Sequence, residues 1–396
     1  MLDPYVIDWL GLLVRWFHFM MGVAWIGASF YFVWLNNTVR PVTDDKPGVA
    51  GGLFAIHGGA FYEVTKYAGA PAKLPEVLHW FKWEAYLTWI SGFILLILHF
   101  WLSAGSTMVD PAVADLSPLA AVGVGAGTLL GGWLFYDTLC KTPLKEKGGL
   151  LAGILYAFIV AVAFGLSQLL SARAAYVHVG AMLGTWMAAN VFFVIIPGQR
   201  SMVDAMVANQ PPPLERGKAG GLRSLHNNYF TLPVLFVMIS GHFPQTWGHS
   251  RGWLILAALG IVGATYRHWI NLDERGIHRP WLPYAALAGL IAIAVAARPA
   301  PVVVKSDGPR VRMAEVQQVV AVRCLACHAE EPIHPGYSAP PNGIILQDPR
   351  QIAAAGPKIY QQVVVAKAMP LGNLTQITDQ ERDLFARWAA QEGYAR

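Results

Sequence analysis

The sequence is poor in charged side chains: only 13% of its 396 residues are Asp, Glu, Lys or Arg, whereas 55% are hydrophobic. So few charges exclude an ordinary soluble globular protein and indicate a membrane protein. The charges are also unevenly spread, because residues 1–298 are sparsely charged and residues 299–396 have the charge density of a soluble domain. The chain therefore divides into a long apolar part and a short soluble part.

Cysteine is scarce as well. Of the three cysteines, Cys324 and Cys327 share one short motif and Cys140 is left over, which excludes a disulfide framework. The N-terminus lacks the basic start and small-residue cleavage site of a signal peptide, so we expect the first apolar run to be a retained helix. The net charge of +5 lies in the apolar part, where membrane topology explains it better than nucleic-acid binding does.

Eight windows of mainly apolar residues are long enough to predict membrane-spanning helices. They lie near residues 12–34, 84–102, 118–139, 150–170, 175–196, 229–243, 252–270 and 281–297. The sixth window is the weakest, because it is short and contains Pro233. An even number of spans places both ends of the chain on one side of the membrane.

The loop charges give the orientation. The first, third, fifth and seventh loops carry nearly all the basic loop residues, with Arg267 counted in the seventh, whereas the intervening loops hold only Arg173 and Arg251. The positive-inside rule therefore places the odd loops in the cytoplasm and both termini outside. For a bacterial inner-membrane protein, this location is the periplasm, where haem is attached to c-type cytochromes.

Two loops are unusually long, at residues 36–82 and 198–228, and long loops in compact proteins are often functional. Residues 299–310 contain Pro, Gly and charged side chains, which is typical of a linker. We therefore predict an integral membrane catalytic domain over 1–298, a linker over 299–310 and a soluble domain over 311–396.

The soluble part contains Cys-x-x-Cys-His, with Cys324 and Cys327 placed to form two thioether bonds to a haem and His328 to bind its iron. The later stretch KAMPLGN supplies Met369 as the second axial ligand. A capping box at Thr378 predicts a closing helix. The soluble part is thus expected to be a small class I cytochrome c domain with one covalent haem c.

A bare Cys-x-x-Cys also occurs in zinc and redox sites. Zinc would need two further ligands, and the soluble part offers only His334 and no other cysteine. The motif therefore favours haem over zinc.

Charged and histidine residues inside membrane spans are costly and usually functional. In the predicted topology His18, His99, His178 and His242 all lie toward the outer ends of their helices, and Arg15 is one turn from His18. We hypothesise a non-covalent b-type haem here, with His18 as the first choice of iron ligand and Arg15 facing a propionate. The alternative is that each imidazole binds a neighbouring backbone group.

A second polar set gathers at the cytoplasmic side. It comprises His57, Glu63, Lys66, His79, Lys82, Trp83, Glu84, Arg223, His226, Asn227, Asn228, Tyr229 and His268. Cations, amides and aromatic faces suit an anionic planar heterocycle. Interfacial anchoring explains many of these positions equally well, but it explains poorly the polar run that enters a helix in RSLHNNYFTLP.

The whole chain resembles one family, the bacterial membrane-bound urate hydroxylases (urate oxidases) with a C-terminal cytochrome c. The resemblance rests on RWFHFMMGVAWIGASFYFVWLN, LPEVLHWFKWEAYLTWISGF, RSLHNNYFTLPVLFVMISGHFP, RCLACH and AMPLGN. It implies an all-α fold, a polytopic bundle of about eight transmembrane helices followed by the cytochrome. It also implies oxidation of urate to 5-hydroxyisourate, with electrons passed to haem c and on to a respiratory acceptor, either a soluble cytochrome c or a terminal oxidase.

The resemblance provides no template for the urate site, so those residues are predicted from their chemistry. We expect Arg223 and Lys66 to stabilise the urate anion and Asn227 to bind a ring edge. His226 and His57 are the candidate bases for proton removal or water activation.

Two other functions stay open. A quinol:cytochrome c oxidoreductase would take electrons from quinol, although a quinone site would be more apolar than the cytoplasmic set. A non-catalytic membrane anchor for an electron-carrying cytochrome c would need only one or two helices.

Overall fold

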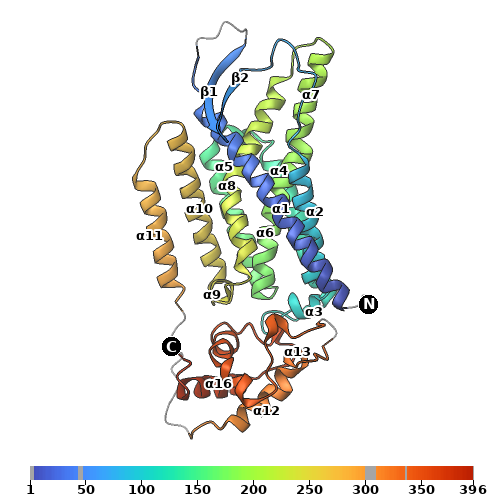
Figure 1. Ribbon diagram of the computed structural model, residues 1–396, viewed down its shortest axis with the longest axis vertical. Coiled ribbons are helices and arrows are strands. Elements are labelled where there is room, and N and C mark those ends of the chain that lie inside the picture. Colours follow the sequence, from blue (N-terminus) through green and yellow to red (C-terminus); the bar gives the residue numbers. More distant parts are fainter. Residues whose placement is uncertain (1–3, 43–47, 299–308, 335–336, 396) are drawn as a thin grey trace.

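The structure, a computed structural model, describes residues 4–42, 48–298, 309–334 and 337–395. A bundle of long helices forms one end of the molecule and a smaller group of short helices forms the other (Figure 1). Most of the predicted linker, residues 299–308, lies outside the described residues.

The bundle consists of long helices. They are α1 (Pro4–Thr38), α2 (Trp83–Leu96) with its π-helical continuation η1 (Ile97–Trp101), α4 (Pro118–Leu139), α5 (Gly148–Ser167), α6 (Ala172–Ala189) with η3 (Asn190–Ile195) and α7 (Ile196–Val207), α8 (Leu214–Ser240), α10 (Gly252–Glu274) and α11 (Trp281–Ala296). The short elements α3 (Ala104–Thr107), η2 (Pro143–Glu146) and α9 (Pro244–Trp247) lie between them. Helix α6 is central, because most of its side chains are buried.

The outer surface of the bundle is apolar. Large hydrophobic side chains such as Leu119, Leu130 and Ile291 are more than half exposed, as expected of helices that face lipid. Six helical stretches are long and apolar enough to cross a membrane: Tyr5–Thr38, Trp83–Trp101, Pro118–Leu139, Gly148–Ser167, Ala172–Val207 and Gly252–Glu274.

The predicted sixth and eighth windows also coincide with helices, α8 and α11. Helix α8 is too polar to stand among the six apolar stretches, and α11 is a shorter apolar helix. The helical class and six candidate spans are therefore observed among the described residues, and eight spans stay a prediction.

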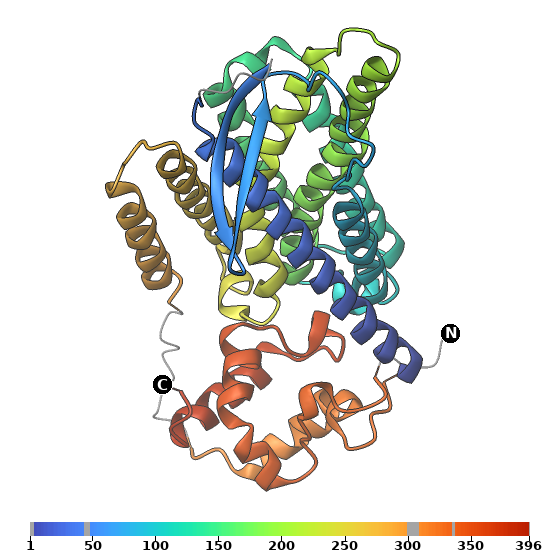
Figure 2. The same cartoon turned by 45° about the horizontal axis from the view of Figure 1, so that its top comes forward.

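Part of the predicted first loop is a β-hairpin. Strands β1 (Val49–His57) and β2 (Ala60–Tyr67) pair antiparallel and form a hairpin that follows α1, drawn in front of the bundle in Figure 2. The two-residue turn is Gly58-Gly59, both with positive φ (59° and 81°), which is the conformation that a tight hairpin turn needs and that glycine adopts without strain. The sequence analysis missed this turn signal.

The predicted loop over residues 198–228 is wrong. Helix α7 continues to Val207 and α8 begins at Leu214, so only residues 208–213 connect them. The polar residues RSLHNN are therefore part of a helix inside the bundle, where their side chains face other helices.

The C-terminal part is a small helical unit with its own core. It contains α12 (Met313–Arg323), α13 (Leu325–His328), η4 (Pro341–Gly343), α14 (Pro349–Ala354), α15 (Gly356–Ile359), η5 (Tyr360–Val365), η6 (Leu371–Asn373) and α16 (Asp379–Gln391). Val316, Phe385 and Trp388 are almost fully buried in this core. The capping box predicted at Thr378 is present and begins α16.

The C-terminal part lies against the end of the bundle at which α1 begins (Figure 1). The hydroxyl of Ser338 donates to the carboxylate of Asp8. At Gly372, where φ is 56°, a Cβ atom would lie 2.5 Å from the backbone oxygen of Ser106 in the bundle. Only glycine permits this approach. The start of the bundle and the C-terminal part are thus at one end, as the even span count predicts.

Candidate functional site

The longest buried polar network in the bundle joins α4, η3 and α8. We call it the Arg223 network, and it comprises Tyr136, Asp137, Asn190, Arg223, His226 and Asn227. Asn190 Nδ2 donates to the Tyr136 hydroxyl (2.9 Å) and to Asn227 Oδ1 (2.8 Å). Arg223 Nη1 donates to Asn190 Oδ1 (3.1 Å), and His226 Nδ1 shares a hydrogen bond of 2.9 Å with the Tyr136 hydroxyl.

Helical periodicity explains why these side chains meet. Arg223 and Asn227 are four residues apart on α8 and so share one face, which is turned toward α6 and η3. Asn190 begins the π-helical stretch η3, a type of helix distortion that is frequent at functional sites. The network therefore forms where a polar stripe of α8 meets a bulge in the central helix.

The charge of Arg223 is already balanced. Its Nη2 lies 2.7 Å from Asp137 Oδ1, and its guanidinium lies over the Tyr136 ring at 4.9 Å. Asn227 Nδ2 donates to the backbone oxygen of Met187 (3.0 Å). The Arg223 network therefore satisfies its own donors and acceptors, and Arg223 is not free to neutralise a substrate anion.

The other two residues predicted for the substrate site lie outside this network. His57 is an exposed residue at the end of β1, and Lys66 on β2 donates to Asn36 near the end of α1. Within the described residues, neither side chain has a hydrogen bond to the Arg223 network. The structure thus brings together Arg223, His226 and Asn227 but not His57 or Lys66.

Three of the outer histidines sit against glycines of neighbouring helices. A Cβ at Gly92 would lie 2.8 Å from His18 Cε1, one at Gly11 would lie 3.0 Å from His99 Cε1, and one at Gly125 would lie 2.5 Å from His178 Nε2. The absent side chains let the imidazoles lie close to the neighbouring backbone. Small residues at these crossings are what allow the helices to approach.

The hydrogen bonds of these imidazoles differ. His178 Nδ1 donates to the Ala174 oxygen (2.8 Å) and its Nε2 accepts from Trp101 Nε1 (3.1 Å), so no ring nitrogen is left for iron. His18 Nδ1 donates to the Thr88 oxygen (2.9 Å), which is how metal-binding histidines are commonly oriented, with Nε2 left to the metal. His18 fits an iron ligand and His178 does not.

Arg15 contacts His99 rather than a group beside His18. Its Nη2 lies 3.0 Å from His99 Nε2, so His99 accepts a hydrogen bond there. His242 follows α8 and is exposed. The four outer histidines therefore do not form one equivalent set.

Cys324, Cys327 and His328 of the predicted haem motif lie at the end of α12 and in α13. His328 Nδ1 donates to the Ile344 oxygen (3.0 Å), which leaves Nε2 for iron. Cys324 and Met369 both pack against the apolar core of this part. Burial, followed by the neighbouring Cys327, raises the pKa of the Cys324 thiol to about 12, so it is a neutral apolar group. The four residues fit a covalent haem c.

The described residues contain no group of side chains that matches a zinc site. Among the residues that the structure describes, no three His, Cys, Asp or Glu side chains are grouped so that they could hold a metal ion. His334, the other histidine of the C-terminal part, therefore does not complete a zinc site with the two cysteines.

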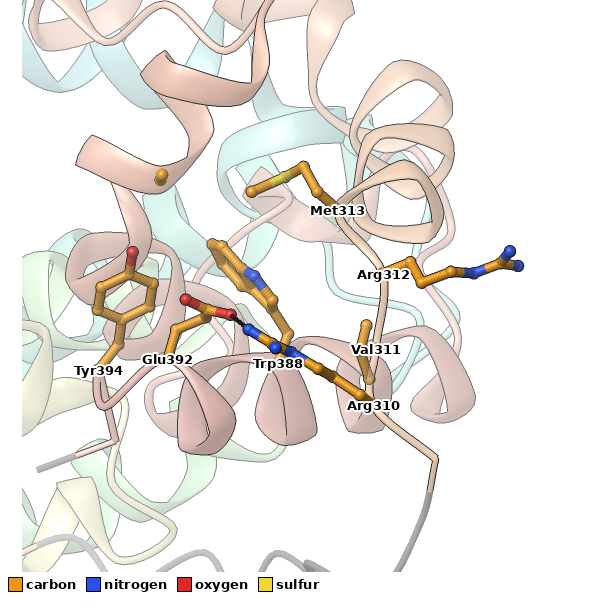
Figure 3. A pocket seen from close by; sticks show the side chains of 8 residues that line it. Arg310, Val311, Arg312, Met313, Trp388, Glu392 and Tyr394 are labelled. Carbon is orange, nitrogen blue, oxygen red and sulfur yellow. Dashed lines mark hydrogen bonds and ion pairs between the residues drawn. The ribbon is translucent and has the colours of Figure 1, made fainter.

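A cavity of about 360 Å³ opens in the C-terminal part (Figure 3). It is lined by Arg310, Val311, Arg312, Met313, Ala353, Trp388, Glu392 and Tyr394. Arg310 and Glu392 form an ion pair of 3.4 Å across it. None of the haem-motif residues lines this cavity, so it lies apart from the attachment site.

Sequence reasoning missed Arg267. The charge pattern assigns it to a cytoplasmic loop, but α10 continues to Glu274 and Arg267 is 3% exposed. Asn271 follows it by four residues on the same helix and is equally buried. The sequence feature that could have indicated these buried polar residues is an Arg and an Asn four residues apart in an apolar helix.

Comparison with known proteins gives one match. A family model described as urate oxidase N-terminal matches residues 4–298. No curated protein and no solved structure matches the chain. The matched range covers the helical bundle and ends before the C-terminal part.

Proposed function

This chain belongs to the urate oxidase N-terminal family, and from that premise we propose that its bundle oxidises urate to 5-hydroxyisourate and passes the electrons to a haem c in its C-terminal part. The family match over residues 4–298 carries the proposal. The contact of the C-terminal part with the bundle at Gly372 supports the direct transfer of electrons within one chain.

The reaction fixes what the protein must supply. Urate and water together lose two electrons and two protons, and the oxygen of water forms a bond to a ring-fusion carbon. The protein must therefore stabilise the urate anion, accept protons and provide an exit for electrons. The chain's own residues supply the first two, and a haem supplies the third.

Four residues would hold the haem c: Cys324 and Cys327 by thioether bonds, and His328 and Met369 as axial ligands. When bound, the haem accepts one electron at a time, and His/Met ligation favours its reduction. Arg382 fixes the loop that carries Met369, because its Nη1 donates to the Met369 oxygen (2.9 Å).

We also propose a non-covalent b-type haem in the bundle, with His18 as its iron ligand. The orientation of the His18 ring by Thr88 supports this choice. Electrons from the cytoplasmic half would need such a relay, because a membrane span is about 30 Å long.

Two pairs of a tyrosine hydroxyl and an imidazole each include one residue of α8, and the imidazole of each pair can accept a proton. His226 is paired with Tyr136 (2.9 Å), and His268 is paired with Tyr229 (2.7 Å). In the first pair the Arg223 network holds the imidazole in place. In the second pair the imidazole is more exposed.

For the location we propose a multi-pass protein of the bacterial inner membrane, with both termini and the C-terminal part in the periplasm. The sparsely charged outer loops support this orientation. The C-terminal part would then deliver electrons to a soluble cytochrome c or to a terminal oxidase.

Urate-dependent reduction of the haem tests the function. Membranes that contain the full chain are mixed with urate under anaerobic conditions, while urate absorbance and the reduced c-type band are followed. Loss of urate coupled to haem reduction is expected. Reduction by quinol alone would instead identify a quinol:cytochrome c oxidoreductase, and no reduction by either donor would leave a membrane-anchored electron carrier.

A further inference from the structure

A second polar cluster lies between α1, α8 and α10. We call it the Arg267 cluster, and it comprises Phe30, Asn228, Arg267 and Asn271. Asn228 is 0% exposed, and Arg267 and Asn271 are each 3% exposed. The guanidinium of Arg267 lies over the ring of Phe30 at 4.1 Å. These side chains are therefore enclosed within the bundle.

Unlike the Arg223 network, this cluster does not satisfy its own polar atoms. Asn271 Nδ2 donates to Asn228 Oδ1 (2.9 Å). Within the described part of the chain, Arg267 Nε, Arg267 Nη2, Asn228 Nδ2 and Asn271 Oδ1 are buried without a hydrogen-bond partner. The cluster therefore presents three donors and one acceptor. If both amides were turned over, each would still leave one polar atom free.

Arg267 also makes no ion pair within the described part of the chain. Among the described residues, no carboxylate lies within 4 Å of its guanidinium, and the nearby Glu274 instead accepts a hydrogen bond from Asn37 Nδ2 (2.8 Å). A buried cation with neither counterion nor full hydrogen bonding is strongly unfavourable. An anion that binds between α8 and α10 would remove this cost.

The free atoms define the chemistry of that anion. The Nε and Nη2 atoms of an arginine form a planar edge that suits two acceptors side by side. The amide donor of Asn228 and the amide acceptor of Asn271 suit a ligand that carries both N–H groups and carbonyl oxygens. Urate is a planar anion whose ring edges carry both kinds of group.

We propose that Arg267, Asn228 and Asn271 bind the urate anion. This inference rests on the proposed function and moves anion binding away from Arg223, which Asp137 already neutralises. For the proton acceptor we choose His268, the exposed imidazole that follows Arg267 on α10 and shares a hydrogen bond with Tyr229 of α8.

The position of the site matters for electron transfer. Arg267 is 15 residues beyond Gly252, the start of α10, which corresponds to about 22 Å of helix. Helix α10 begins at the end of the bundle near the C-terminal part (Figure 1), where a Cβ at Gly248 would lie 3.0 Å from the backbone oxygen of Ala366. Urate bound at Arg267 would therefore react far from the C-terminal haem. A haem at His18 would serve as a relay for electrons across this distance.

The test is direct binding of urate to the purified full chain, measured by equilibrium dialysis. Arg267→Gln should weaken urate binding by roughly 100-fold, because a charge-assisted, two-bond contact is lost. Arg251→Gln, which removes an exposed arginine at the start of the same helix, is the matched control and should bind like the wild type.

A second variant, Asn271→Asp, distinguishes a loss of the urate site from a folding defect in Arg267→Gln. Its carboxylate would pair with Arg267 inside the chain, so the variant should be at least as heat-stable as the wild type and yet bind urate weakly. Normal haem c content and chemical reduction of that haem would show that the rest of the chain is intact.

The outcomes separate this site from the function. If the wild type oxidises urate but both Arg267→Gln and Asn271→Asp bind it normally, the site is wrong and the function stands. If inorganic phosphate protects the wild type against heat in an Arg267-dependent way and urate does not, the cluster binds another anion and the site is again wrong. If the wild type neither binds nor oxidises urate, the function itself fails.

Discussion

Arg223 Nη2 and Asp137 Oδ1 lie 2.7 Å apart between α8 and α4. The Arg223 side chain is 4% exposed and that of Asp137 16%. Two opposite charges held so close inside the bundle explain how α8 can carry the polar run RSLHNN among apolar helices. The pair is therefore a structural element of the bundle.

Removing the carboxylate should therefore destabilise the bundle. Asp137→Asn would leave the Arg223 charge buried without a partner, at a cost of about 3 kcal/mol in the free energy of unfolding. Thermal unfolding in detergent would measure the loss. Asp204→Asn on α7 removes the same charge from an exposed site and should change little. A second substitution, Arg223→Met, should restore part of the stability lost in Asp137→Asn, and a further decrease would contradict this account.

The outer histidines should behave differently from one another. His18→Ala should remove b-type absorbance from the purified protein and leave haem c in place, because Thr88 orients His18 with its Nε2 available. His178→Phe should retain the b-type band, since both ring nitrogens of His178 are already hydrogen-bonded. Exposed His242→Ala is the control. A wild type with no b-type absorbance after full haem supply would rule out this cofactor.

The two imidazoles beside α8 should have separable effects. If urate binds at Arg267, His268→Gln should lower the rate of urate oxidation about 100-fold. His226→Gln should keep the rate of urate oxidation and lower thermal stability, because it breaks the bond to Tyr136. The opposite pattern would place the substrate beside the Arg223 network.

Hydrophobic length was enough to predict the helices of the bundle. Each of the eight windows coincides with a helix, because a run of apolar residues in lipid has no alternative to internal backbone hydrogen bonding. The same reasoning missed the long N-terminal half of α8. Arg223, His226 and Asn227 in this half are satisfied by Asp137, Asn190 and Tyr136. These partners are remote in sequence, and no local pattern could show them.

The candidate site residues also fall into two groups: those that a local motif indicates and those that depend on the three-dimensional structure. The predicted haem motif is local, so Cys324, Cys327 and His328 could be proposed from spacing alone, and the haem itself stays a prediction. The substrate residues depend on which polar atoms find partners in three dimensions. Arg223 and Arg267 look alike in sequence. Only the structure shows that Asp137 neutralises Arg223, whereas Nε and Nη2 of Arg267 have no hydrogen-bond partner among the described residues.

The contact at Gly372 should control electron transfer between the two parts of the chain. A Cβ there would lie 2.5 Å from the Ser106 oxygen, so Gly372→Ala should push the C-terminal part away from α3. Gly343→Ala is a matched control, because Gly343 has a similar φ of 65° but no atom within 4 Å of the added Cβ. Both variants carry the strain of about 1–2 kcal/mol that a non-glycine residue has in this conformation, and only the first disturbs the contact.

Haem c should therefore attach and respond to chemical reductants in both variants, while urate-driven reduction, followed by stopped-flow absorbance, should slow at least about tenfold in Gly372→Ala alone. This is the expected effect of moving a donor and an acceptor apart without altering either one. Equal rates in the two variants would mean that electrons leave the bundle by a route that does not cross the Gly372–Ser106 contact.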